Sequence, residues 1–196
     1  MTNSLDIRTL NFVIAGIVPL ITHNGQLANH FNSHTKRLKS LTSIKSKKEE
    51  NHLEIQRVEW EGGLYLNNKG EPCIPLDVLR ATFTNGAKKS KHGPIFKAGV
   101  YFNSDGELIY DGPRTVEGLA ERFNEFSDVR LVNVNGSKVL RTRPIYNDWK
   151  VKFSVDFDPS IIDEADVIAA VANAGRTVGM CEMRPTYGRF VIESVK

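Results

Sequence analysis

The stretch Asp148–Val195, DWKVKFSVDFDPSIIDEADVIAAVANAGRTVGMCEMRPTYGRFVIESV, decides the fold of this chain. From Trp149 to Phe157, apolar and polar residues alternate without a break. Because side chains two positions apart share one face of a strand, the pattern predicts a strand with one buried face. Asp158-Pro159 ends this strand, since proline has no N–H to donate to the ladder. Phe190–Val195 alternates again and predicts a closing strand.

A helix is expected between these two strands. Asp163 is a favourable N-cap residue, and Gly175 is expected to stop the helix in the left-handed conformation. The apolar residues that recur at helical spacing are Ala165, Ile168, Ala169 and Ala172. The segment therefore predicts a helix laid on an antiparallel sheet, which is an α+β arrangement.

Length and charge set wide bounds on the class of protein. The chain has 196 residues, which favours one domain, residues 1–196, with a proper core. Lysine and arginine number 26 against 23 acids, so the net charge of +3 does not by itself indicate a nucleic-acid-binding protein. The distribution of these charges carries more information than their sum.

Targeting and redox signals point to a cytoplasmic protein. The apolar run Phe12–Ile21 is far shorter than the ~20 residues that span a membrane, so we expect no membrane partner. The N-terminal MTNSLDIRTL has no basic start leading into an apolar core, and we expect no signal peptide. Cys73 and Cys181 have no metal-ligand spacing and are typical of reduced thiols.

The rest of the chain predicts further strands. Leu10–Ile21 is typical of a buried strand that ends near Pro19, and Phe12–Val18 is expected in the same sheet as Trp149–Phe157. Short strands are also expected at Leu64–Leu66, Lys97–Phe102 and Leu108–Tyr110.

A helix with two different faces is expected after Pro75, a residue that suits a first helical turn. Its apolar face holds Leu76, Leu79, Phe83 and Ala87. Its opposite face holds Arg80, Thr84, Lys88 and Lys91. Such a cationic stripe is either a solvated surface or a surface that contacts phosphates, and the spacing alone does not choose between them.

Two further segments gather basic residues. The insertion 36–59 looks helical and begins with the acid-free run Lys36–Lys48, which includes Lys45, Lys47 and Lys48. Residues 129–143 alternate around Asn135-Gly136 and predict a protruding hairpin that carries Arg141 and Arg143.

Catalytic signatures are mostly absent from the sequence. There is no phosphate-binding glycine loop with lysine, no nucleophile elbow and no zinc-protease motif. His30 and His34 have the i, i+4 spacing of two metal ligands on one helix, but no further ligand completes a shell, so we expect no metal and no cofactor. A histidine such as His23 could instead act as general acid or base in RNA cleavage.

Three stretches stand out in their order along the chain: VPLITHNGQL (18–27), EPCIPLDVLRATFTNGAKKSK (71–91) and AGRTVGMCEMRPTYGRFVI (174–192). Together they resemble the RAMP superfamily, the ferredoxin-like (RRM-like) RNA-binding proteins that form the backbone and processing subunits of CRISPR effectors. The resemblance implies a modified ferredoxin-like fold with helices on one face of the sheet. It also implies that the final loop, which in the family often ends in Gly-Tyr-Gly-Arg, lies against RNA, and Tyr187-Gly188-Arg189 matches that ending.

The chain also departs from the family pattern. Its loop holds Met180, Glu182 and Met183 in place of small residues. The segment from Thr22 to Glu59 contains no aspartate, which argues against the target cleavage that some backbone subunits perform there. Its length fits a compact, solitary RAMP-like protein, such as one carried by a bacteriophage and working in the host cytoplasm, better than a full backbone subunit.

The resulting hypothesis is a non-catalytic protein that binds single-stranded nucleic acid, with RNA favoured over DNA, and self-associates along the strand as a homo-oligomer. One alternative is a metal-independent endoribonuclease of the same fold. Another is a mimic of the backbone subunit, of the anti-CRISPR kind, that contacts CRISPR effector subunits. The residues expected to contact nucleic acid are Arg80, Lys88, Lys91, Arg141, Arg143, Arg176, Arg184, Tyr187, Arg189, Lys45, Lys47 and Lys48.

Overall fold

The computed structural model describes residues 6–196, and its contacts group into two compact units. The first unit comprises the chain up to Leu20, Leu66–Asp111 and Asn147–Lys196. The second comprises Ile21–Tyr65 and Gly112–Tyr146. That these units form one RAMP-like domain stays a prediction.

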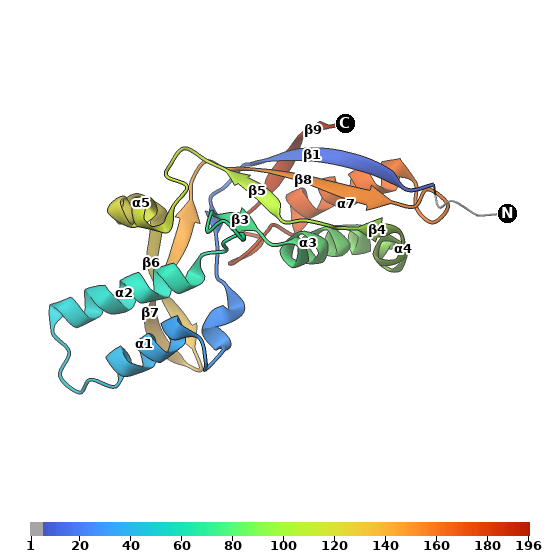
Figure 1. The fold of residues 1–196 in the computed structure, drawn as a ribbon. Coiled ribbons are helices and arrows are strands. Elements are labelled where there is room, and N and C mark those ends of the chain that lie inside the picture. The colour runs from blue at the N-terminus through green and yellow to red at the C-terminus, as the bar shows by residue number, and fades with distance from the viewer. Residues whose placement is uncertain (1–5) are drawn as a thin grey trace. The chain divides into compact units, whose positions relative to one another are not determined.

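The first unit is an antiparallel sheet with helices. Its helices are α3 (Leu76–Lys89), α4 (Gly93–Gly99) and α7 (Glu164–Thr177), and its strands are β1 (Arg8–Gly16), β3 (Cys73–Ile74), β4 (Val100–Tyr101), β5 (Gly106–Ile109), β8 (Lys150–Phe157) and β9 (Phe190–Val195). The strand order is β3-β5-β8-β1-β9, and β4 also pairs with β8 (Figure 1). The elements β1, α3, β5, β8, α7 and β9 follow one another as β-α-β-β-α-β, the ferredoxin-like succession. The predicted α+β fold is confirmed.

The core of this unit is built on the buried face of β8. Val151, Phe153, Val155 and Phe157 are buried, as their alternation predicts. The ring of Phe153 stacks on Phe12 of β1 at 5.2 Å and on Phe83 of α3 at 5.0 Å between ring centroids. Helices α3 and α7 lie side by side against the sheet (Figure 1).

Helix α7 forms where it is expected, but it buries a different face. Its buried residues include Val167, Ala170, Val171 and Ala174. The residues that the sequence placed on the apolar stripe include Ala165, Ala169 and Ala172, and these three are exposed. Alanine marks a buried face weakly because its side chain buries little apolar area. The branched valines define the face instead.

The end of α7 also differs from the prediction. Gly175 does not stop the helix, which continues to Thr177. A Cβ atom at Gly175 would lie 2.2 Å from the carbonyl oxygen of Phe190, so glycine is needed there for close packing against β9. The left-handed residue is Gly179, with φ +76, and its N–H donates to the carbonyl of Ala174 at 2.9 Å.

Three expected strands are shorter than predicted. Strand β1 ends at Gly16, before the expected end at Val18. Residues 97–99, expected as strand, belong to α4, because Pro94 lies in the first turn of that helix and favours it. The expected strand over 64–66 is reduced to an isolated bridge between Leu66 and Pro72.

The second unit combines a small sheet with helices. Its elements are β2 (Leu20–Ile21), the 3-10 helix η1 (Gly25–Ala28), α1 (Ser33–Thr42), α2 (Glu49–Gly63), α5 (Val116–Glu121), α6 (Phe123–Phe126), β6 (Ser127–Val134) and β7 (Ser137–Tyr146). The sheet order is β2-β7-β6. The predicted hairpin is the β6–β7 pair, and Asn135 (φ 50) and Gly136 (φ 84) give it the turn in which both central residues are left-handed.

An ion pair and hydrogen bonds from buried side chains connect helix α2 to the hairpin and to α6. The carboxylate of Glu59, only 5% exposed, pairs with Arg141 and accepts the N–H of Thr142 at 3.0 Å. The indole N–H of Trp60 donates to the carbonyl of Phe126 at 2.8 Å. The basic insertion is thus two helices, α1 and α2, joined by residues 43–48. Along the described chain, no helix has the length and apolar character needed to cross a membrane.

Replacing Phe153 by alanine tests the core of the first unit. The ring is 3% exposed and stacks on two others, so its removal should lower the free energy of unfolding by ~3–5 kcal/mol. Urea denaturation measures this loss. Lys152→Ala, one residue away on the exposed face, should change it by less than about 0.5 kcal/mol. A loss below about 1 kcal/mol for Phe153→Ala would contradict the buried-face assignment.

Candidate nucleic-acid interface

A groove of ≈ 610 Å³ lies along α3 and α4 in the first unit. It is lined by three cations, Arg80 and Lys88 of α3 and Lys97 of α4. Asp77 also lines it and pairs with Arg80 at 2.6 Å, but both side chains are more than half exposed, so this pair is weak. We call this surface the α3–α4 groove.

A buried hydroxyl lies among these cations. Thr84 lines the same groove and is only 4% exposed, and its Oγ1 has no hydrogen-bond partner within residues 6–196. A buried polar group without a partner costs free energy. An acceptor atom of a ligand that enters the groove would remove this cost. The groove therefore offers both positive charge and an available donor to an anion.

The structure changes the predicted cationic stripe in two places. Lys91 does not continue it, because α3 ends at Lys89 and Lys91 takes a left-handed conformation with φ 64. Lys97, which the sequence placed in a strand, joins the groove from α4 instead. Arg80 and Lys88 lie in the groove as their helical spacing predicts.

The C-terminal loop, residues 178–189, is held in a compact form by its glycines. Gly179 and Gly188 have φ values of +76 and +71. The N–H of Met180 donates to the carbonyl of Gly188 at 2.8 Å, and the N–H of Gly188 donates to Pro19 at 2.9 Å. The side chain of Met180 is fully buried, so it anchors the loop in place of the small residue expected from the family.

This loop and its flanks carry four of the predicted contact residues. Arg184 is exposed, and Tyr187 and Arg189 are half-buried. Arg176 lies in the last turn of α7, exposed, and donates to Asn173 at 3.0 Å. Burial raises the pKa of the Cys181 thiol in this loop to about 12, against a smaller lowering by Arg184. Because only the thiolate is a strong nucleophile, Cys181 is not suited to catalysis near neutral pH.

The remaining predicted contact residues belong to the second unit. Arg141 and Arg143 line a cavity of ≈ 660 Å³ together with Lys39 and residues of η1. Lys45 and Lys48 are exposed in the connection between α1 and α2, where Lys47 donates to the carbonyl of Ile44 at 2.8 Å.

The histidines do not form a metal site. His30 precedes α1, which begins at Ser33, so it does not share a helix face with His34. His34 lies 3.9 Å from a carboxylate oxygen of Glu61. In residues 6–196, no three histidine, cysteine or acidic side chains are grouped as a metal ion would require. His23 and His30 both line the second-unit cavity.

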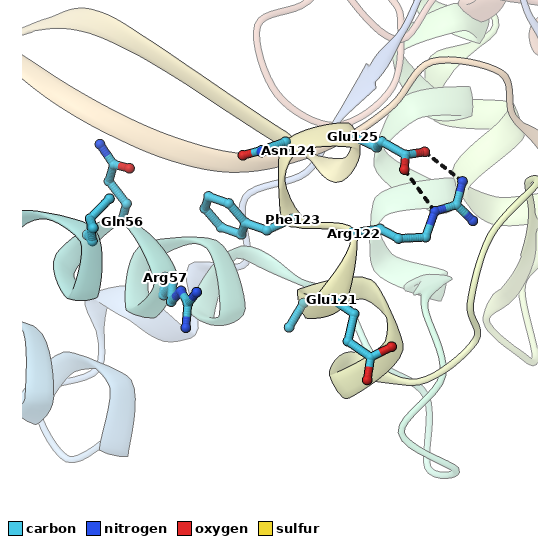
Figure 2. Close-up of a pocket in the computed structure, with 9 residues that line it drawn as sticks. Gln56, Arg57, Glu121, Arg122, Phe123, Asn124 and Glu125 are labelled. Atoms are coloured by element: carbon cyan, nitrogen blue, oxygen red, sulfur yellow. Dashed lines mark hydrogen bonds and ion pairs between the residues drawn. The ribbon is translucent and has the colours of Figure 1, made fainter. Parts of the chain in front are cut away.

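A second pocket of the same unit, of ≈ 440 Å³, lies between α2 and α5–α6 (Figure 2). Figure 2 shows the ring of Phe123 directed toward α2. This ring meets Trp60 of α2 edge-on, with 5.5 Å between the ring centroids. The hydrogen bonds from Arg122 hold the pKa of Glu125 below its usual value. Cations and acids both line this pocket, so it has no clear preference for phosphate.

Known proteins resemble this chain in structure but not in sequence. No family model and no curated protein matches the chain. Among solved structures, a chain of the type III-B Cmr-beta complex bound to cognate target RNA is similar over 98% of this chain, with a TM-score of 0.55 and 11% identity. This chain spans 61% of the length of that one. Cmr6 from Pyrococcus furiosus is matched over its whole length and 96% of this chain, with a TM-score of 0.43 and 11% identity. The likeness to the Cmr-beta chain supports the predicted α+β fold.

Proposed function

We propose that this protein binds single-stranded nucleic acid, with RNA favoured over DNA, through the α3–α4 groove. The observation that carries the proposal is the groove itself, which Arg80, Lys88 and Lys97 line together with Thr84, whose buried hydroxyl has no partner within residues 6–196. Phosphate contacts from lysine and arginine dominate affinity for nucleic acids because they release counterions. RNA is favoured because the structurally similar Cmr-beta complex is bound to target RNA.

The open face of the sheet is a weaker candidate for the same ligand. Its cations are matched by acids, since Lys150 pairs with Glu193 at 2.5 Å and Lys152 lies opposite Glu107 in the sheet register. Other polar groups on this face bond to one another, as Ser154 does to Asn11 at 2.6 Å. The groove, by contrast, has cations in excess and an unpaired donor.

The C-terminal loop extends the proposed contact surface. Arg184 and Arg189 would hold phosphates, and the half-buried ring of Tyr187 could stack on a base, which is a mode that tolerates many sequences. Its backbone bonds fix the loop before any ligand is present, so little ordering entropy would be lost on binding. Self-association along the strand and contact with effector subunits belong to the same proposal.

Removing two groove cations tests where the nucleic acid binds. Lys88→Ala with Lys97→Ala should weaken binding to every single-stranded sequence alike. The salt dependence should fall by roughly one to one and a half units in the slope of log K against log salt, since each phosphate contact on a single strand contributes about 0.7. Fluorescence anisotropy with a labelled oligonucleotide at several salt concentrations measures both quantities.

The matched control removes two exposed cations of the same unit outside the groove, Lys69 and Lys196. This double variant should keep the slope of the wild-type protein. If both double variants lower the slope equally, net charge and not the groove sets affinity. If no oligonucleotide binds the wild-type protein at low salt, the proposal is wrong, and the backbone-mimic alternative takes its place.

The C-terminal loop is tested separately. Arg184→Ala and Arg189→Ala should each weaken RNA binding about three- to tenfold, because each removes a charged phosphate contact. Arg184 is exposed, so its replacement should leave thermal stability unchanged, and a melting curve checks this. Arg114→Ala provides a matched arginine control outside the loop. Wild-type affinity in both loop variants would exclude the loop from the contact surface.

A further inference from the structure

The ≈ 660 Å³ cavity of the second unit has a lining unlike that of the α3–α4 groove. Between α1, η1 and the β6–β7 hairpin, it combines aliphatic side chains such as Leu38 and Val132 with the cations Lys39 and Arg141. A concave site with a mainly apolar surface and a few converging polar groups is the usual form of a small-molecule site, and this volume lies within the usual range.

The charge inside this cavity is positive. Glu59 lines it, but both of its oxygens are already engaged, one by Arg141 and one by the N–H of Thr142 at 3.0 Å. A guanidinium group has five N–H donors, so the bond to Glu59 fixes Arg141 in place and leaves other donors for a ligand. Within residues 6–196, no ion pair engages Lys39.

A third donor lies beside these two cations. Thr142 lines the cavity and is 2% exposed, and its Oγ1 has no hydrogen-bond partner in the described chain. A hydroxyl that is buried without a partner is destabilising unless something else supplies an acceptor. Its position in the lining makes a bound anion the natural source of that acceptor.

We propose that the second-unit cavity binds a nucleoside monophosphate. Lys39, Arg141 and the hydroxyl of Thr142 hold the phosphate, and Leu38 and Val132 pack against the base. A phosphomonoester carries about −1.5 to −2 charges near neutral pH and three acceptor oxygens, which matches two cations and a hydroxyl. A carboxylate has only one charge, whereas the lining holds the three cations Lys39, Arg141 and Arg143 against the single acid Glu59. The same terminal phosphate occurs on a free nucleotide and on the 5′ end of an RNA strand.

This inference goes beyond the proposed function, because the site lies in the other unit and takes one nucleotide instead of a strand. Lys88→Ala with Lys97→Ala should leave nucleotide binding unchanged. Lys39→Ala should leave the salt slope for an oligonucleotide with a 5′-hydroxyl end unchanged. Nucleotide affinity therefore tests the cavity, and the salt slope for the oligonucleotide tests the groove, so that either proposal can fail while the other holds.

Isothermal titration with the four nucleoside 5′-monophosphates, the matching nucleosides and inorganic phosphate tests the site. At least one monophosphate should bind more tightly than its nucleoside and than inorganic phosphate. Lys39→Ala should weaken its binding about tenfold. Thr142→Val, which keeps the shape of the side chain, should weaken it several-fold without lowering the melting temperature, since no hydrogen bond of the protein is lost. Thr142→Ser, which keeps the hydroxyl, should bind the monophosphate with the affinity of the wild-type protein.

The chain offers matched controls on the same helix. Lys36 and Leu41 belong to α1 but do not line the cavity. Lys36→Ala and Leu41→Ala should bind the monophosphate as the wild-type protein does. Leu38→Ala should lower the affinity for the monophosphate and leave the affinity for inorganic phosphate unchanged.

Five results decide between these outcomes. No heat from any of the four monophosphates overturns the proposal. Equal affinity for inorganic phosphate and monophosphates, or equal losses in Lys36→Ala and Lys39→Ala, also overturns it. If Lys39→Ala weakens binding of a 5′-phosphorylated tetranucleotide but not of the 5′-hydroxyl form, the site is supported and its ligand is the 5′ end of an RNA strand. Binding of free monophosphates alone supports it with a free nucleotide.

Discussion

The stack of three rings, Phe12 on Phe153 on Phe83, is the contact on which the first unit depends. It joins β1, β8 and α3, three elements that are far apart in the sequence. Because side chains alternate along a strand, a register slip of one residue in β8 would move Phe153 to the open face and bring Lys152 inside. The stack therefore fixes the strand register and places α3 on the covered face. The groove lies along α3, so its position follows from the same contact.

Glycines set how closely the helices of this unit approach their neighbours. A Cβ atom at Gly86 of α3 would lie 2.1 Å from the carbonyl oxygen of Ala170 in α7. Periodicity predicts β8 and α3 well, because large apolar residues mark their buried faces. It could not predict the buried face of α7, where alanine is common on every side, or the packing role of Gly175. That role depends on the Phe190 backbone fifteen residues later, and local sequence carries no trace of it.

The candidate site was predictable in part, for the same physical reason. Arg80 and Lys88 share a face of α3 because helical spacing dictates it, and they line one groove. Lys91 has the same helical spacing, but α3 ends two residues before it. The position of a helix end depends on local hydrogen bonding, which a periodic pattern of residues does not reveal. Thr84 lies on the face that the spacing predicts, but its burial and its unpartnered hydroxyl are visible only in the structure. Lys97 becomes recognisable only when α4 is placed beside α3, because no spacing in the sequence connects residue 97 to that face.

Buried hydroxyls give the two cavities a common property that charge alone would not. Exposed lysines are usually solvated, and a cationic surface by itself is weak evidence of a ligand. Thr84 and Thr142 are different, since each is more than nine-tenths buried and lacks an acceptor within residues 6–196. A folded protein that keeps such a group bears a cost in stability. Thr22 and Thr82 bear the same cost and line neither cavity, so it is the cations of the same lining that distinguish Thr84 and Thr142. In each unit the hydroxyl lies beside cations, and phosphate is the ligand chemistry that engages both kinds of donor. The two proposals therefore rest on the same combination of donors, in a groove of the first unit and in a cavity of the second.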